Sequence, residues 1–210
     1  MKVIRQATLD DQATISALRI EEFKRANEFS LVRPERLLWD SCDDKNVVLG
    51  AWDGPDAVST MRAVLVRNSA QAIQCLQCTI PAHIIYPVIV LNSGATRLEY
   101  RGAGLNSALR YYVITAAQRN QIKTIMGPIY KGAPRTNFMQ KLGYTFITPT
   151  KSWQNKLNPK KVRLLAFLKK SQFNQAATLI KTSRADVLRE FPWAGGPISF
   201  PTLEINQKVG

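Results

Sequence analysis

The stretch that decides the fold covers residues 87–121 and reads PVIVLNSGATRLEYRGAGLNSALRYYVITAAQRNQ. Its first part, residues 88–91, is an apolar run of strand length that is rich in β-branched residues. Its last part repeats apolar residues at the spacing of a helix buried along one face, at Leu105, Ala108, Leu109, Tyr112, Val113, Ala116 and Ala117. The stretch therefore predicts a strand, a turn and a helix.

The turn before the predicted helix has the composition of an anion-binding loop. The first N–H groups of a helix lack intrahelical partners, and the helix dipole favours negative charge beside them. Gly102 and Gly104 carry no side chains that would keep a phosphate away from these amides, and Arg101 adds a cation. The turn predicts a phosphate-binding loop, and the alternative is an ordinary strand-to-helix turn that uses glycine. A Walker loop and a dinucleotide fingerprint are both disfavoured, because no Lys-Ser/Thr pair follows and the glycine spacing differs.

Two segments carry a resemblance to a known family. Residues 101–106, RGAGLN, resemble the Arg/Gln-x-x-Gly-x-Gly/Ala signature of the GNAT superfamily of N-acyltransferases, in which this loop grips the pyrophosphate of coenzyme A. Asn106 departs from the signature and would either crowd the phosphate or donate an extra hydrogen bond to it. The opening of the chain, IRQATLDDQ over residues 4–12, is similar to the first strand and helix of many GNAT proteins. The resemblance covers about residues 1–150 and implies a mixed α/β fold, with a central, mostly antiparallel sheet flanked by helices.

The resemblance also implies the donor and the site residues. The co-substrate would be acetyl-CoA or another acyl-CoA, and no metal would be needed. The small residues of the central strand would hold pantetheine and the thioester oxygen, and the loop would hold the pyrophosphate; these donor-binding residues are Gly94, Ala95, Thr96, Arg101, Gly102, Ala103, Gly104, Leu105 and Asn106.

The catalytic residues are less well defined by the resemblance. Residues 138–144, FMQKLGY, are similar to the family's Leu-Tyr-Glu-Lys-x-Gly-Phe, but Met139 stands where many members place the tyrosine that protonates the departing thiolate. By position along the chain, Tyr130 is the candidate acid and Ser93 is the candidate residue to hold a water molecule. A mechanism with water as the only acid stays open.

The remaining elements follow from local patterns. Thr8 and Asp11 predict a capping box before the first helix. Strands are predicted over residues 3–7, 46–52, 57–67 and 124–130, and a closing hairpin over 145–156 and 161–170, with its turn at 158–160. Further helices are predicted over residues 34–39, 71–78 and 134–142.

The chain is predicted to form one domain over residues 1–210, with a core over about 1–170 and a C-terminal helical extension over about 171–210. The extension begins with an apolar stripe at Phe173, Ala176, Ala177 and Ile180. A capping box at Ser183 and Asp186 predicts a second helix, and residues 198–200 predict one short strand.

Several protein classes are disfavoured by composition. No apolar run reaches the 18 or more residues of a membrane span, and the N-terminus lacks the apolar core of a signal peptide, so a cytoplasmic protein is expected. Three cysteines argue against a disulfide framework. A metal site would require Cys42 and His83 to converge on Cys75 and Cys78, and we expect no such site.

The positive charge is concentrated in the second part of the chain. Residues 1–90 hold 10 Lys+Arg and 11 Asp+Glu, a balance of −1, whereas residues 91–210 hold 19 and 4, a balance of +15, which together give the net charge of +14. This distribution favours an anionic partner such as coenzyme A, an acidic acyl-carrier protein or nucleic acid, and the alternative is a solvated basic face.

The favoured function is therefore an N-acyltransferase that transfers an acetyl or other acyl group from acyl-CoA directly to a small-molecule or protein amine. Two alternatives stay open. One is an acyl-carrier-protein-dependent enzyme that resembles N-acyl amino acid synthases. The other is a catalytically impaired GNAT-fold protein whose basic half binds a partner or, less favoured, nucleic acid. The sequence also leaves a homodimer open.

Overall fold

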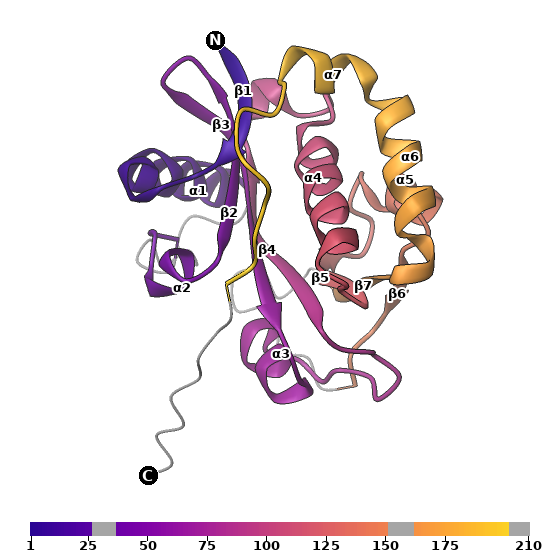
Figure 1. The fold of residues 1–210 in the computed structure, drawn as a ribbon. Coiled ribbons are helices and arrows are strands. Elements are labelled where there is room, and N and C mark those ends of the chain that lie inside the picture. The colour runs from indigo at the N-terminus through magenta and orange to yellow at the C-terminus, as the bar shows by residue number, and fades with distance from the viewer. Residues whose placement is uncertain (27–36, 151–161, 202–210) are drawn as a thin grey trace.

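The computed structural model describes residues 1–26, 37–150 and 162–201. Within these ranges the chain forms a seven-stranded sheet with the order β1-β2-β3-β4-β5-β7-β6 (Figure 1). β4 and β5 are parallel, and the other neighbouring pairs are antiparallel. The predicted mixed, mostly antiparallel sheet flanked by helices, with helices in the C-terminal extension, is confirmed.

The strands are β1 Lys2–Gln6, β2 Val47–Asp53, β3 Asp56–Val66, β4 Val88–Thr96, β5 Thr124–Tyr130, β6 Thr145–Ile147 and β7 Arg163–Lys169. The α-helices are α1 Gln12–Ala26, α2 Ser41–Asp44, α3 Ser69–Leu76, α4 Leu105–Arg119, α5 Thr136–Lys141, α6 Phe173–Ser183 and α7 Ala185–Glu190. Short 3-10 helices are η1 Leu9–Asp11, η4 Leu98–Tyr100 and η5 Lys170–Gln172.

The helices cover both faces of the sheet (Figure 1). α4, α6 and α7 lie on one face, where the largest apolar cluster includes Ile89, Leu109, Ile125, Phe173 and Ile180. α1 and α2 lie on the other face. This second face holds two smaller apolar clusters, one with Ile15, Leu18, Trp39 and Val48, and one with Val64, Leu76, Val90, Met126 and Phe167.

β4 contains a bulge in the middle of its pairing with β3. Arg62 pairs with Asn92 and Thr60 pairs with Ala95, so β4 has one residue more than β3 between the two pairs. Ser93 lies in this bulge with φ +50°. A bulge bends the strand that carries the extra residue. Of the two residues in the bulge, Ser93 and not Gly94 has the left-handed conformation.

β4 and β5 separate soon after they begin. The two strands pair only over Val88–Val90 and Thr124–Met126. At the next position a Cβ on Gly127 would lie 2.5 Å from the carbonyl oxygen of Leu91, so only glycine allows the backbones to come this close. Beyond this point β4 continues along β3, and β5 continues along β7. The sheet therefore opens between residues 92–96 and residues 127–130.

The C-terminal extension packs on α4 and then returns to the first strand (Figure 1). The amide of Ile4 donates to the carbonyl of Pro192 at 2.8 Å, and the amide of Ala194 donates to the carbonyl of Ile4 at 2.8 Å. The predicted strand at residues 198–200 is wrong, because the bridge to β1 forms at Trp193 instead. The predicted capping box at Ser183 is also wrong, since this residue ends α6 and α7 has no side-chain cap.

Two other predicted elements differ from the structure. In the predicted helix at 34–39, residues 34–36 lie outside the described residues and residues 37–39 are not helical. Helix α2 begins later because the carboxylate of Asp40 accepts from the amides of Cys42 at 2.9 Å and Asp43 at 3.1 Å. In the predicted hairpin, β6 ends at Ile147, and the turn at 158–160 lies outside the described residues.

Candidate functional site

The N-terminus of α4 opens on two glycines in left-handed conformations. Gly102 has φ +84°, and Gly104, the residue before the first helical turn, has φ +100°. No side chain caps the first amides of α4 in the described part of the chain. The first turn therefore presents unpaired N–H groups at the positive end of the helix dipole, which is the arrangement that binds anions.

A row of polar side chains continues from this loop along α4. The Nδ2 atom of Asn106 lies 3.7 Å from the position that a Cβ of Gly94 would take, so the Asn106 side chain bridges the space between α4 and β4. Arg110, one turn further, donates to Oδ1 of Asn106 at 3.4 Å and to the hydroxyl of Tyr144 at 2.9 Å. Arg110 is buried, and within the described residues it has no acidic partner.

A second cation lies near Arg110, at the start of α5. The pKa of Arg135 is lowered to about 10, first by desolvation and then by the charge of Arg110, while Tyr144 and Tyr130 act in the opposite direction. Arg135 nevertheless keeps exposed surface. Tyr130, at the end of β5, is thus close enough to Arg135 to interact with it electrostatically.

The open part of β4 holds the predicted strand residues. Ala95 is buried, and its carbonyl accepts from Oγ of Ser59 at 3.2 Å. The hydroxyl of Thr96 lies 2.8 Å from the same Oγ. Ser93 and Gly94 lie at the bulge, where the strand has already left β5. Over residues 92–96, the edge of β4 that faces β5 therefore makes no ladder hydrogen bonds to a described strand.

Arg101 is held by two other elements. Its Nη2 donates to Oε2 of Glu22 at 2.5 Å, and its Nε donates to the carbonyl of Thr96 at 3.2 Å. The side chain of Glu22 is only 3% exposed. The guanidinium of Arg101 is thus paired with a carboxylate of α1.

A charged cluster that the sequence did not reveal lies on the α1 face. Arg19 donates to both carboxylate oxygens of Asp43, at 2.7 and 2.8 Å, and both side chains are buried. Arg62 donates to Oδ1 of Asn92 at 2.8 Å and to Asp40 at 3.0 Å. The cluster reaches β4 at the residue before the bulge. Its members come from four different elements, so no local sequence pattern could indicate it.

The other residues considered in the sequence analysis, Met139, His83 and the three cysteines, lie in surroundings that indicate packing roles. Met139 is buried in the largest apolar cluster. The ring of His83 lies 5.6 Å from the ring of Phe167. The three cysteines are free, and burial raises the pKa of each thiol. Over residues 1–26, 37–150 and 162–201 no group of three or more His, Cys, Asp or Glu side chains could hold a metal ion.

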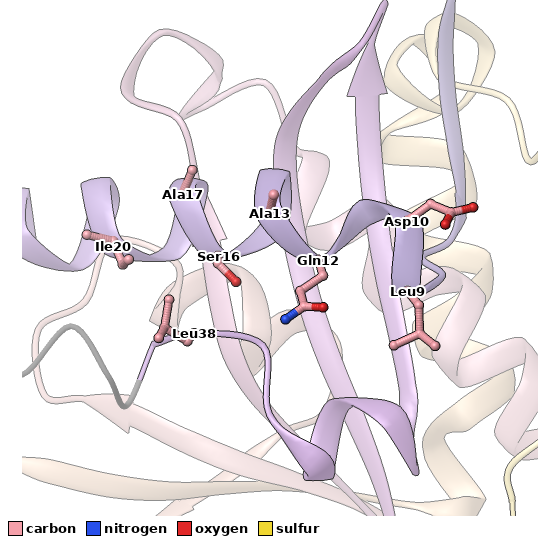
Figure 2. A pocket seen from close by; sticks show the side chains of 8 residues that line it. All are labelled: Leu9, Asp10, Gln12, Ala13, Ser16, Ala17, Ile20 and Leu38. Carbon is pink, nitrogen blue, oxygen red and sulfur yellow. The ribbon is translucent and has the colours of Figure 1, made fainter.

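Two surface grooves lie away from the loop. One, of about 490 Å³, is formed by η1, α1 and Leu38 (Figure 2), and its lining residues are Leu9, Asp10, Gln12, Ala13, Ser16, Ala17, Ile20 and Leu38. The other, of about 500 Å³, lies between the end of β1 and residues 193–197. Neither groove contains a residue of the α4 loop. The candidate site therefore rests on the geometry of the open sheet and of the start of α4, and not on either groove.

In the part of the chain that the structure describes, no helix has the length and apolar character needed to cross a membrane.

Comparison with known proteins gives structural neighbours only. No protein-family model matches the chain, and no curated protein matches it. A CoA-dependent acyl-homoserine lactone synthase, solved with SAM and isopentyl-CoA, is 15% identical with a TM-score of 0.63, and the match covers 97% of this chain and 96% of that chain. An N-acetyltransferase from Staphylococcus aureus Mu50 is 14% identical with a TM-score of 0.56, covering 81% and 99%. A protein from Desulfovibrio desulfuricans that is assigned to the GNAT family of acetyltransferases is 11% identical with a TM-score of 0.52, covering 81% and 99%. This chain therefore has the GNAT fold.

Proposed function

We propose that this protein is a GNAT-fold N-acyltransferase that takes an acyl group from acyl-CoA and transfers it directly to an amine. One observation carries the proposal: the uncapped start of α4 at Gly104 is joined through η4 to β4, the strand that leaves its neighbour. The two features suit the two ends of coenzyme A, because the amides can bind a pyrophosphate and the open strand edge can bond the amide groups of pantetheine. The structural neighbour solved with isopentyl-CoA supports this proposal.

In this proposal each predicted donor residue has a defined task. The amides of Gly102, Ala103, Gly104, Leu105 and Asn106 surround the pyrophosphate, and Arg101 adds positive charge beside them. The backbone of Gly94, Ala95 and Thr96 bonds pantetheine and places an N–H near the thioester oxygen. Acetyl-CoA is the smallest donor of this class, and isopentyl-CoA in the neighbouring structure extends the range to be tested.

The reaction needs few groups from the protein. The neutral amine nitrogen attacks the thioester carbonyl carbon, and the oxyanion that forms accepts a hydrogen bond from the open strand. The amine proton passes to a water molecule held at Ser93, the C–S bond breaks, and Tyr130 protonates the departing thiolate. Holding the two substrates in line supplies much of the rate, so a water molecule in place of Tyr130 is the alternative acid.

The acceptor would enter from the α1 face, where the charged cluster reaches β4. The side chain of Asp40 is 51% exposed and that of Arg62 is 13% exposed, so both signs of charge are accessible beside Asn92. Such a surface suits an acceptor that carries charged groups next to its amine. A cytoplasmic location and a homodimer stay predictions from the sequence.

Thermal-shift measurements with a series of acyl-CoAs test the proposal. Ligand that binds only the native state adds about 2.7 kcal/mol of stability at 100 times its Kd, so Tm should rise with acyl-CoA concentration. Retention on immobilised coenzyme A at physiological salt should exceed retention on plasmid DNA or on acyl-carrier protein. If acyl-CoA causes no shift in Tm and the protein is retained on DNA, the proposed enzyme function is wrong and a nucleic-acid-binding protein is favoured. If only acyl-carrier protein shifts Tm, the donor is acyl-carrier protein and not acyl-CoA.

A further inference from the structure

Arg184, in the C-terminal extension, lies directly over the loop at the start of α4. A Cβ built on Gly104 would lie 2.6 Å from Cδ of Arg184 and 2.9 Å from its Nε. Arg184 is the residue between α6 and α7, eighty positions further along the chain. The glycine at 104 therefore serves a second purpose besides its positive φ, because any side chain there would push Arg184 away.

The guanidinium of Arg184 has no carboxylate to neutralise it within the described residues. It lies over the ring of Phe138, 4.6 Å from the centroid, and Nη1 donates to the carbonyl of Ser183 at 3.2 Å. Its Nε is buried and has no hydrogen-bond partner among residues 1–26, 37–150 and 162–201. A buried N–H without a partner costs free energy, so an acceptor at this place would stabilise the site.

Arg101 and Arg184 thus differ in what they can offer a phosphate. The charge of Arg101 is paired with the buried carboxylate of Glu22, and its Nε is bonded to Thr96. Among the described residues, the contacts of the Arg184 guanidinium are an aromatic ring and a carbonyl, and its Nε faces the loop. An anion gains more from a cation that has no competing carboxylate.

We propose that Arg184 is the side chain that pairs with the pyrophosphate of the donor, so that the α6–α7 extension completes the donor site. The proposal rests on the proposed use of acyl-CoA. The amides of α4 approach the phosphates from one side, and the planar guanidinium approaches from the other and can donate two parallel hydrogen bonds. Phe138 keeps the guanidinium at this place before the donor arrives.

Isothermal titration with coenzyme A and with 3′-dephospho-CoA tests this assignment in four proteins. They are the wild type, Arg184→Gln, which keeps most of the stem without the charge, Arg184→Lys, which keeps a charge, and the control Arg189→Ala. Arg189 lies in the same extension with its side chain 78% exposed, and in the part of the chain that the structure describes its ion pair is with the exposed Asp186. Unfolding midpoints of all four proteins show that each variant is folded.

Arg184→Gln should weaken both ligands by about tenfold or more, as expected for a hydrogen bond to a charged group, and should reduce the salt dependence of binding. Arg184→Lys should recover part of the loss, and Arg189→Ala should bind like the wild type. Equal affinity of the wild type and Arg184→Gln would overturn the proposal and leave the acyl-CoA function intact. A loss seen only with coenzyme A would place Arg184 at the 3′-phosphate and also overturn it. If neither ligand binds the wild type, both this proposal and the proposed function fail.

Discussion

Replacing Gly104 by alanine should destabilise the protein more than the same change at Gly102, and the difference measures the contact with Arg184. Both residues have positive φ, +100° and +84°, so alanine at either site carries a backbone cost of roughly 1–2 kcal/mol. Alanine also restricts the unfolded chain equally at both sites, and this effect cancels in the comparison.

The surroundings of the added methyl group are different at the two sites. No atom of the described residues lies within 4 Å of a Cβ at 102, whereas a Cβ at 104 meets Arg184 at 2.6 Å. Arg184 has a flexible side chain and can move, but the movement takes its guanidinium off Phe138. Loss of such a cation–π contact costs roughly 0.5–2 kcal/mol, so Gly104→Ala should lose that much more stability than Gly102→Ala.

Urea denaturation of both variants, each with and without Arg184→Ala, measures this difference as a double-mutant cycle. The excess loss at Gly104 should disappear when Arg184 is already alanine. An equal loss at the two glycines, or an excess that persists without Arg184, would show that Arg184 does not rest on the loop as described.

Asp43→Asn should lower the free energy of unfolding by about 3–5 kcal/mol, because it leaves the buried Arg19 without its carboxylate. Urea denaturation measures this loss, and a loss below about 1 kcal/mol would mean that the pair is accessible to water. The hydrogen bond from Arg5 lowers the pKa of Asp11 in the folded protein. The pair therefore stabilises the fold fully above the pKa of Asp11 in the unfolded chain, about 4, and this stabilisation is lost as pH falls through the lower pKa of the folded state. Asp11→Asn should therefore flatten the fall in stability below about pH 4 in denaturation curves recorded at stepwise pH, and an unchanged slope would contradict the pairing. Tyr130→Phe should lower kcat by about 100-fold with unchanged donor affinity, measured by thiol release, and a silent variant would leave water as the acid.

The local features of the site could be predicted because short-range physics decides them. The periodic apolar residues after Leu105 specify one buried helix face, and α4 follows them from Leu105 to Arg119. The loop was predicted from the absence of side chains at Gly102 and Gly104, and the structure adds that both glycines have positive φ. The capping box of Thr8 and Asp11 is confirmed for the same reason, since its two partners are three residues apart.

The partners of the loop could not be predicted, because they depend on how distant elements pack. Glu22 meets Arg101 only because α1 crosses the open end of β4, and Arg184 meets Gly104 only because the extension folds back on α4. Neither contact has a signal within a window of neighbouring residues. The bulge shows the same limit on a smaller scale, since the pairing of β4 with β3 gives the left-handed conformation to Ser93 and not to the neighbouring Gly94.

The bridge between the first strand and residues 192–194 has a consequence for biosynthesis. Ile4 is translated before strands β2 to β7, yet its hydrogen bonds on the outer edge of β1 are completed by Pro192 and Ala194, which are translated after β7. We expect the outer edge of β1 to stay open to solvent and to other chains throughout translation. Chains that end before Phe191 should therefore be more sensitive to protease in β1 than the full chain, although they contain strands β1 to β7.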